Sequence, residues 1–363
     1  MPRRFGQKPA ILADVAVAVG LSPAAVSLAL RGKPGVSEGT RTRVLDAARA
    51  LGYRQVVGIA RLRHDPLTIG LVAKVHIGPQ EANAFYSPVV AGIQASCRSH
   101  HIDLMLATMP VDQHQYPIEL PRIVTNGTCD GLIVVGAHLS PATTAAFRTA
   151  PPTVLVDAYA EDNAFDAVVM DNVGGARSAI RHLVSRGHRD IAILATEPQA
   201  YPSILERRVG YDQILVEEKL TPHYIDADFW QPESAAAKAV AYIKAHPEVT
   251  AIFCANDLVA VALLQAVRQE GISVPDRLSV VGFDDIDVAK FVSPALTTMA
   301  VDKVGMGQLA VTLLLHRLEV NKESATLTFL RPTLVEREST QAAEPEAPLN
   351  EADFAPHVDL RTA

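Results

Sequence analysis

Positively charged side chains crowd the first 63 residues, where they could contact the phosphates of a nucleic acid. Eleven Lys and Arg side chains stand there against three Asp and Glu, a formal charge of +8. The whole chain of 363 residues carries −7, so the remainder carries −15. A basic segment joined to an acidic remainder predicts a nucleic-acid contact confined to that segment.

The other reactive residue types give no indication of catalysis or of metal binding. Cys97, Cys129 and Cys254 are far apart and each lies in an apolar stretch, which predicts buried free thiols in a reducing compartment. The adjacent His100 and His101 have no evident third ligand, so a solvated helix end is expected. The chain has no GxGxxG, GxxxxGK[ST], HExxH or GxSxG motif. We therefore expect no enzymatic activity, no cofactor and no metal.

Composition predicts a soluble globular protein with room for more than one domain. Hydrophobic residues make up 48% of the chain and charged residues 20%. No run of about 18 apolar residues occurs, so neither a membrane span nor a membrane partner is expected. The N-terminus lacks the cleavage signature of a secretory signal, and a cytoplasmic location is expected.

Short helices are predicted at the N-terminus, where they would position the basic side chains. Apolar residues at helical spacing predict a first helix from Ile11 to Val19, which Gly20 ends. Ser22 is a suitable N-cap for a second helix, Pro23 to Leu30. This pattern of helix-ending and helix-capping residues fits a helix-turn-helix, although a plain three-helix bundle is the alternative.

A third helix is predicted after Ser37, which would be its N-cap, and Gly52 would end it. Its expected buried face consists of Val44, Leu45, Ala48 and Leu51.

The segment Ala13 to Arg54, "ADVAVAVGLSPAAVSLALRGKPGVSEGTRTRVLDAARALGYR", resembles the DNA-binding head of the lactose-repressor (LacI/GalR) family almost position for position. The resemblance implies a helix-turn-helix domain over residues 1–54, with Pro23 to Leu30 as the recognition helix in the major groove. The residues expected to contact DNA are Ser22, Pro23, Ala24, Ala25, Ser27, Leu28, Arg31 and Tyr53.

The chain departs from the family where bases are read. Relatives often have polar residues at the positions of Pro23 and Ala24, and an arginine at the position of Leu28. An arginine there would make bidentate contacts to guanine, whereas Leu28 offers only apolar contact. We expect a different operator as a result. Ser27 fits a hydrogen bond to DNA and a small packing role equally well.

Residues 55–66 lie where the family has a hinge helix that folds on operator DNA. Ungapped alignment puts the leucine that wedges into the minor groove at Leu62. The usual Pro-Asn is replaced by Gln55 and Val56, and Gly58 weakens a helix interior. The hinge is expected to order only on DNA, and the alternative is a flexible linker with an incidental leucine.

From Leu67 onward, short apolar runs alternate with amphipathic stretches, which predicts parallel sheets with helices on both faces and, by length, two lobes. The expected strands are Thr68–Ala73, Asp103–Ala107, Gly131–Val135, Val154–Asp157, Ile191–Ala195, Ala251–Cys254 and Ser279–Gly282. The expected helices are Pro88–His100, Gly174–Arg186, Ser203–Lys219, Glu233–His246 and Leu258–Glu270. Ligands of such sheets bind beyond the carboxyl ends of the strands.

The strings "VVMDN", "RRVGY", "AIFCANDLVAVALLQ" and "VPDRLSVVGFDDI" resemble the LacI/GalR effector domain in order and spacing. The implied fold is an N-terminal all-α helix-turn-helix head plus an α/β periplasmic-binding-protein-like body. The body would consist of two doubly wound parallel-sheet lobes over residues 67–340, which bind an effector and dimerise. Residues 341–363 are rich in Ala, Glu and Pro and are expected to form a disordered acidic tail.

The resemblance also implies an effector site. It carries over Arg207 and Asn256 as donors and Asp284 as acceptor for sugar hydroxyls. Trp230, or Phe229 beside it, would be the aromatic platform, and the other side would be closed by Phe85 and Tyr86.

Structural roles are the alternatives for these residues. Asp284 could cap a turn, Arg207 could pair with an acid on its own helix, and Trp230 could be core. Asp171 is suited to a ligand contact or to a helix cap. Structural turn or cap roles are expected for Asp257, Asp285 and His188.

The resemblance therefore predicts a homodimeric repressor that binds a palindromic site in double-stranded operator DNA. A small polar effector, expected to be a carbohydrate, would close the lobes and change the DNA affinity. Relatives include both induced release and corepression, so the sign of the response stays open. The alternative, a solute-binding protein for sugar uptake, does not account for the basic head.

Overall fold

The structure is a computed structural model. The residues that it describes are 12–30, 35–51, 67–76, 83–112, 114–162, 164–320 and 324–343. The predicted hinge with Leu62, the predicted DNA contacts Arg31 and Tyr53, and residues 344–363 of the predicted tail lie outside the described residues.

Three helices make up the described N-terminal part: α1 (Leu12–Val19), α2 (Pro23–Leu30) and α3 (Glu38–Leu51). Gly20, with a φ of +68°, ends α1, and the chain bends by 100° between α1 and α2. This bend is within the ~90–120° that is typical of a helix-turn-helix. The Oγ of Ser22 accepts from the Ala25 amide at 3.2 Å, and the Oγ of Ser37 accepts from the Thr40 amide at 3.3 Å. Both predicted N-caps are thus confirmed.

The head has its own apolar core, made of Val15, Ala16, Val19, Val26, Ala29, Val44 and Ala48. The prediction was wrong for Leu45 and Leu51, which are 36% and 42% exposed. Leu45 is turned about 100° around the helix from Val44, and Leu51 is the last residue of α3. No single helix among the described residues is long and apolar enough to cross a membrane; α1 and α2 meet that criterion only together, across their bend.

The first lobe of the body is a parallel six-stranded sheet in the order β13-β7-β5-β3-β1-β2. Its strands are β1 (Thr68–His76), β2 (Asp103–Val111), β3 (Gly131–Val135), β5 (Thr153–Val156), β7 (Asp166–Met170) and β13 (Leu327–Leu330). Its helices are α4 (Asn83–Ser99), α5 (Pro141–Thr149) and α10 (Lys303–Glu319), with a short helix η2 (Arg122–Val124). A small parallel pair, β4 (His138–Leu139) and β6 (Tyr159–Ala160), adjoins this sheet.

The second lobe is a six-stranded sheet in the order β14-β12-β11-β10-β8-β9. Its strands are β8 (Ile191–Leu194), β9 (His223–Ile225), β10 (Ala251–Cys254), β11 (Ser279–Asp284), β12 (Thr297–Ala300) and β14 (Thr333–Val335). Its helices are α6 (Asn172–Ser185), α7 (Pro202–Glu218), α8 (Pro232–Ala245) and α9 (Asp257–Gln269), with a short helix η3 (Asp287–Lys290). The prediction of parallel sheets is confirmed, with one exception: the edge strand β14 pairs antiparallel with β12.

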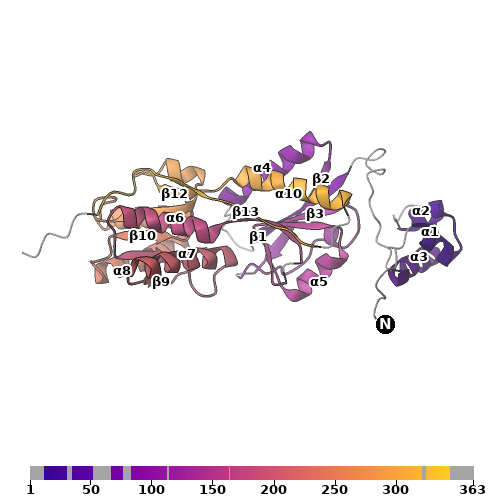
Figure 1. The fold of residues 1–363 in the computed structure, drawn as a ribbon, viewed down its shortest axis with the longest axis horizontal. Coiled ribbons are helices and arrows are strands. Elements are labelled where there is room, and N and C mark those ends of the chain that lie inside the picture. The colour runs from indigo at the N-terminus through magenta and orange to yellow at the C-terminus, as the bar shows by residue number, and fades with distance from the viewer. Residues whose placement is uncertain are drawn as a thin grey trace, which may run out of the picture.

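The chain passes between the lobes three times: after β7, after β12, and between β13 and β14. Figure 1 shows the lobes side by side, with α4, α5 and α10 around one sheet and α6, α7 and α8 around the other. Asp171 and Asp302 stand at the first two crossings, and each caps the next helix by accepting from a glycine amide at 2.8 Å. The helix-cap alternative for Asp171 is therefore confirmed.

Candidate functional site

A pocket lies between the lobes, at the carboxyl ends of strands from both sheets. It is a hollow that is partly open to solvent and lined by side chains of both lobes. The six residues that sequence analysis assigned to the effector site all line it: Phe85, Tyr86, Arg207, Trp230, Asn256 and Asp284. They come from α4, from α7 and from segments that follow strands of the second sheet, so only the tertiary fold brings them together.

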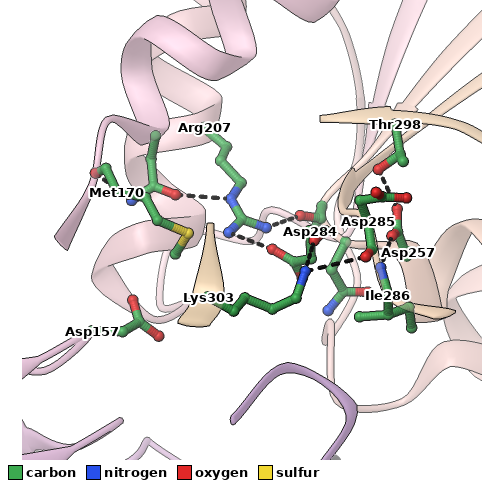
Figure 2. Close-up of polar contacts among 12 residues, drawn as sticks. Asp157, Met170, Arg207, Asp257, Asp284, Asp285, Ile286, Thr298 and Lys303 are labelled. Carbon is green, nitrogen blue, oxygen red and sulfur yellow. Dashed lines mark hydrogen bonds and ion pairs between the residues drawn. The ribbon is translucent and has the colours of Figure 1, made fainter. Parts of the chain in front are cut away.

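Arg207, on α7, organises the wall formed by the second lobe. Its side chain is 2% exposed and lies over the Phe283 ring, with 3.8 Å between the guanidinium carbon and the ring centroid. Its Nη2 donates to Asp284 at 3.1 Å, its Nε donates to Asn172 at 3.1 Å, and its Nη1 donates to the Ala255 carbonyl. Figure 2 shows this guanidinium directed at Asp284. Its ion pair is therefore made across the fold and not with an acid on its own helix.

Asp284 ends β11 in a strained conformation. Its φ is +108° and that of Asp285 is +49°, values that side-chain-bearing residues rarely adopt. Lys303, at the start of α10, donates to the carbonyls of both residues and so ties the first lobe to this turn (Figure 2). Burial raises the pKa of Asp284, while Arg207 and Lys303 lower it.

Asn256 has a second role that the sequence did not indicate. Its Oδ1 accepts from the Val259 amide at 2.9 Å, so Asn256 is the N-cap of α9. The amide nitrogen of the same side chain can only donate, as the predicted contact to a sugar hydroxyl requires.

Asp257 is fully buried behind the pocket but is not a helix cap. It accepts from the Thr298 hydroxyl at 2.6 Å and the Ile286 amide at 2.9 Å, which fixes the turn after β11 (Figure 2). Burial raises its pKa to about 8. Asp285 pairs with Arg337 at 2.6 Å. These contacts confirm the predicted structural roles of both residues, and of the two roles expected for Asp257 they support the turn.

His188 is also structural: its ring nitrogens lie 2.9 Å from the Thr250 hydroxyl and 3.1 Å from the Gln341 carbonyl.

Sequence analysis missed the polar residues of the first lobe, Lys74 and Asp157, which line the same pocket. The Lys74 Nζ lies 4.7 Å, 4.9 Å and 5.0 Å from the ring centroids of Tyr86, Tyr201 and Trp230, and donates to Gln115 at 2.9 Å. We call these three rings the aromatic cage. Burial lowers the pKa of Lys74 to about 7, and Asp157 opposes that shift.

Asp157 holds the two lobes in contact. Its Oδ2 accepts from the Tyr86 hydroxyl at 2.7 Å, and its backbone carbonyl accepts from the Tyr201 hydroxyl of the second lobe at 2.8 Å. Burial raises the pKa of Asp157 to about 6, although Tyr86 and Lys74 lower it. A signal was available for both missed residues, because Lys74 directly follows one predicted strand and Asp157 ends another.

The recognition helix presents part of its surface to the outside. Ser22, Pro23 and Ala24 are exposed, and the predicted DNA contacts Ala25, Ser27 and Leu28 are half-buried. Val26 and Ala29 face the head core. The first turn of α2 and one of its sides are thus available for DNA.

One cluster among the described residues has the spacing for a metal ion: ligand atoms of His223, His246 and Glu248 lie within 4.8 Å of one another. His223 contacts the Tyr242 hydroxyl at 3.0 Å and Asp190 at 3.3 Å, and His246 contacts Glu248 at 3.0 Å. Hydrogen bonds within the second lobe account for this arrangement, which lies outside the pocket lining.

Two family profiles match the chain. Residues 11–55 match "Bacterial regulatory proteins, lacI family", and residues 180–340 match "Periplasmic binding protein-like domain".

Curated relatives align over nearly the whole chain. The HTH-type transcriptional repressor CytR of Escherichia coli (strain K12) is 30% identical over 347 residues, which cover 94% of this chain and 99% of the relative. The PurR repressor of Photobacterium profundum is 29% identical, covering 92% and 99%, and the ribose operon repressor of Haemophilus influenzae is 28% identical, covering 91% and 98%.

Solved structures share the fold. A complex of the transcriptional regulator CelR with cellobiose has a TM-score of 0.62 and 26% identity, covering 91% of this chain and 99% of that one. A dimeric Lac repressor bound to operator has a TM-score of 0.62 and 24% identity, covering 92% and 100%. An Enterococcus faecium regulator with bound ribose has a TM-score of 0.63 and 23% identity, covering 76% and 100%. The similarities to the Lac repressor and to the ribose-bound regulator are evidence for the shared fold only.

Proposed function

The chain belongs to the lacI family of bacterial regulatory proteins, and on this premise we propose that it is a repressor controlled by a sugar or sugar derivative bound between its lobes. It is a ligand-responsive DNA-binding transcriptional regulator with a helix-turn-helix head and a periplasmic-binding-protein-like body. The relatives are transcriptional regulators and not enzymes. Such a repressor would meet its operator in the bacterial cytoplasm.

The observation that carries the proposal is the composition of the pocket walls. The lining includes the paired Arg207 and Asp284 together with the rings of the aromatic cage. Sugars combine hydroxyls that need donors and acceptors with C–H faces that pack on aromatic rings, so this combination of side chains suits them. The ligand named for one related structure, cellobiose, supports the same class of effector.

Contacts across the cleft offer a route from effector to DNA. Tyr201 of the second lobe donates to Asp157 of the first, and Lys303 of the first lobe donates to the Asp284 carbonyl of the second. A ligand that replaces or tightens these contacts changes the angle between the lobes. We propose that this change moves the two hinges of a dimer, with Leu62 as the minor-groove wedge, and so alters operator affinity.

Exposed apolar side chains support a homodimer. Leu106, on the edge strand β2, is 62% exposed, and Met105 beside it is 41% exposed. In the second lobe, Phe291 is 83% exposed, directly after η3. Large exposed apolar residues mark interaction surfaces, and a two-fold dimer that covers them would present two heads to a palindromic operator.

The experiment that tests the proposal uses the single tryptophan of the chain, Trp230. Its fluorescence should change on titration with a sugar that enters the pocket. The same sugar should change a gel shift on the DNA upstream of the gene. A sugar that binds without changing the gel shift would contradict effector control, and intact DNA binding with no response to any sugar would contradict the sugar class.

The substitution Asp284→Asn tests the site directly. It keeps an acceptor for Arg207 but removes the charge, so the effector response should fall at least tenfold while operator affinity stays unchanged. Loss of both in the same variant, measured by gel shift with and without sugar, would point to a folding role for Asp284.

The substitution Leu28→Arg tests the recognition helix. A bidentate contact to guanine is worth about 1–3 kcal/mol of discrimination, so selection from randomised DNA should return a site with a new G·C preference in each half. The same site for both proteins would contradict the placement of α2 in the major groove.

A further inference from the structure

Lys74 reaches across the cleft from the strand next to the edge of the first-lobe sheet. It lies on β1, between β2 and β3. Its ammonium group sits among the three rings of the aromatic cage, of which Tyr86 belongs to the first lobe and Tyr201 and Trp230 to the second. The ammonium is therefore a feature of the pocket interior and not of the outer surface.

The ammonium group has few acceptors. It can donate three hydrogen bonds, and the one bond it makes with the described residues goes to the neutral Oε1 of Gln115. Among the described residues Arg207, Arg317 and Arg337 each have a carboxylate partner, whereas Lys74 forms no ion pair. A half-buried ammonium with this surrounding favours an anion brought by a ligand, because charge-assisted hydrogen bonds are about twice as strong as neutral ones.

Asp157, on the same wall, has an oxygen that lacks a hydrogen-bond donor within the described part of the chain. Its Oδ2 accepts from Tyr86, but its Oδ1 is buried and has no hydrogen-bond partner in the described structure. A buried carboxylate oxygen without a donor is unfavourable, because it has lost its hydration, and a ligand hydroxyl would satisfy it. Among the described residues the pocket thus presents a cation without an ion-pair partner and a carboxylate oxygen that lacks a donor.

We propose that the effector is an anionic sugar derivative, a sugar acid or sugar phosphate, whose anionic group is bound by Lys74 while a neighbouring hydroxyl donates to Asp157. This inference rests on the proposed sugar effector and adds the charge of the ligand to it. Asp284, the other carboxylate of the pocket lining, is neutralised by its ion pair with Arg207 and so does not oppose the anion. A bound anion would also stabilise the charged form of Lys74, whose pKa burial lowers.

The test is a set of matched ligand pairs titrated against the full-length protein by Trp230 fluorescence. The pairs are galactose with galacturonate, glucose with glucuronate and with gluconate, glucose with glucose 6-phosphate, and ribose with ribose 5-phosphate. In at least one pair the anion should bind at least tenfold more tightly than the neutral sugar. The uronate and aldonate pairs distinguish a carboxylate from the phosphate of the last two pairs.

Variants then assign the preference to Lys74. Lys74→Met, which refills the aromatic cage without charge, should bind the anion no better than the neutral sugar, and Lys74→Arg should keep the preference. Lys244→Met is the matched control, because Lys244 pairs with Glu270 on the exposed surface of the second lobe. A preference for the anion that persists in Lys74→Met would overturn the inference.

Two further outcomes separate this inference from the proposed function. If neutral sugars bind and change the gel shift while every anion binds equally or more weakly, the sugar effector stands and the role of Lys74 is overturned. If no member of any pair binds, the sugar class itself fails and this inference fails with it.

Discussion

The two walls of the pocket differ in how far the protein satisfies its own polar groups. On the second-lobe wall, Arg207 donates to three acceptors and Asp284 has a cationic partner. On the first-lobe wall, Lys74 donates to one neutral amide and the Oδ1 of Asp157 has no partner among the described residues. The satisfied wall can hold its shape without a ligand, whereas the polar groups of the other wall would be satisfied by the effector that we propose.

Burial affects the titration of both walls. It shifts the pKa values of Lys74 and Asp157 toward neutrality, to about 7 and about 6, so the charge of each group changes near neutral pH and a ligand can stabilise the charged form. Burial also raises the pKa of Asp284, against the opposing effects of Arg207 and Lys303.

Arg207→Met should have the largest effect on stability, because it leaves Asp284 as a buried charge without its partner. Breaking a buried ion pair by removing one member costs about 3–5 kcal/mol in the free energy of unfolding. Urea denaturation followed by circular dichroism measures it. The control Arg181→Met removes an exposed pair with Glu217 and should cost less than about 1 kcal/mol. Equal losses in the two variants would mean that the second-lobe wall is not a stabilising network.

Lys74→Met should change how stability depends on pH. The pKa of Lys74 is about 7 in the folded protein and 10.5 when unperturbed. The unfolded chain therefore binds an extra proton between these values, so the free energy of unfolding should rise with pH across that window. The slope contributed by Lys74 is at most about 1.4 kcal/mol per pH unit.

The measurement compares urea denaturation of the wild type and Lys74→Met at pH 7 and pH 9. The wild type should gain about 2 kcal/mol relative to the variant over this interval. Taking the difference between the two proteins removes the contribution of the titrating groups that do not interact with Lys74, whereas Asp157, whose pKa Lys74 lowers, still contributes. Parallel pH profiles would show that the Lys74 ammonium is well solvated, and the contrast between the walls would then disappear.

Two tyrosine variants rank the two contacts of Asp157. Tyr86→Phe removes a hydrogen bond to the carboxylate and should cost about 1.5–3 kcal/mol, whereas Tyr201→Phe removes one to the backbone carbonyl and should cost about 0.5–1.5 kcal/mol. Denaturation of both variants at neutral pH measures this order. A reversed order would indicate that the contact between the lobes outweighs the contact within the first lobe.

The sequence by itself was sufficient for the head and for much of the body. Ser22, Gly20 and Ser37 fix the ends of their helices through local caps and turns, which depend on few neighbours. The strands Gly131–Val135 and Ala251–Cys254 have the predicted bounds because they are short, wholly apolar and buried on both faces. The strands β7 and β12 were missed, since "DAVVM" and "TTMA" are short and begin with polar residues that are buried only in the fold.

The predicted effector residues were assigned through the family resemblance, and their partners only through the tertiary structure. Arg207 and Asp284 were assigned from motifs, but nothing in the sequence indicates that they pair with each other across 77 positions. Lys74, Asp157 and the aromatic cage come from segments of both lobes that meet only after the chain has crossed between them. Local sequence determined the elements and their caps, because those depend on near neighbours. Tertiary structure decided which polar groups are satisfied, because burial and partners are properties of the assembled lobes.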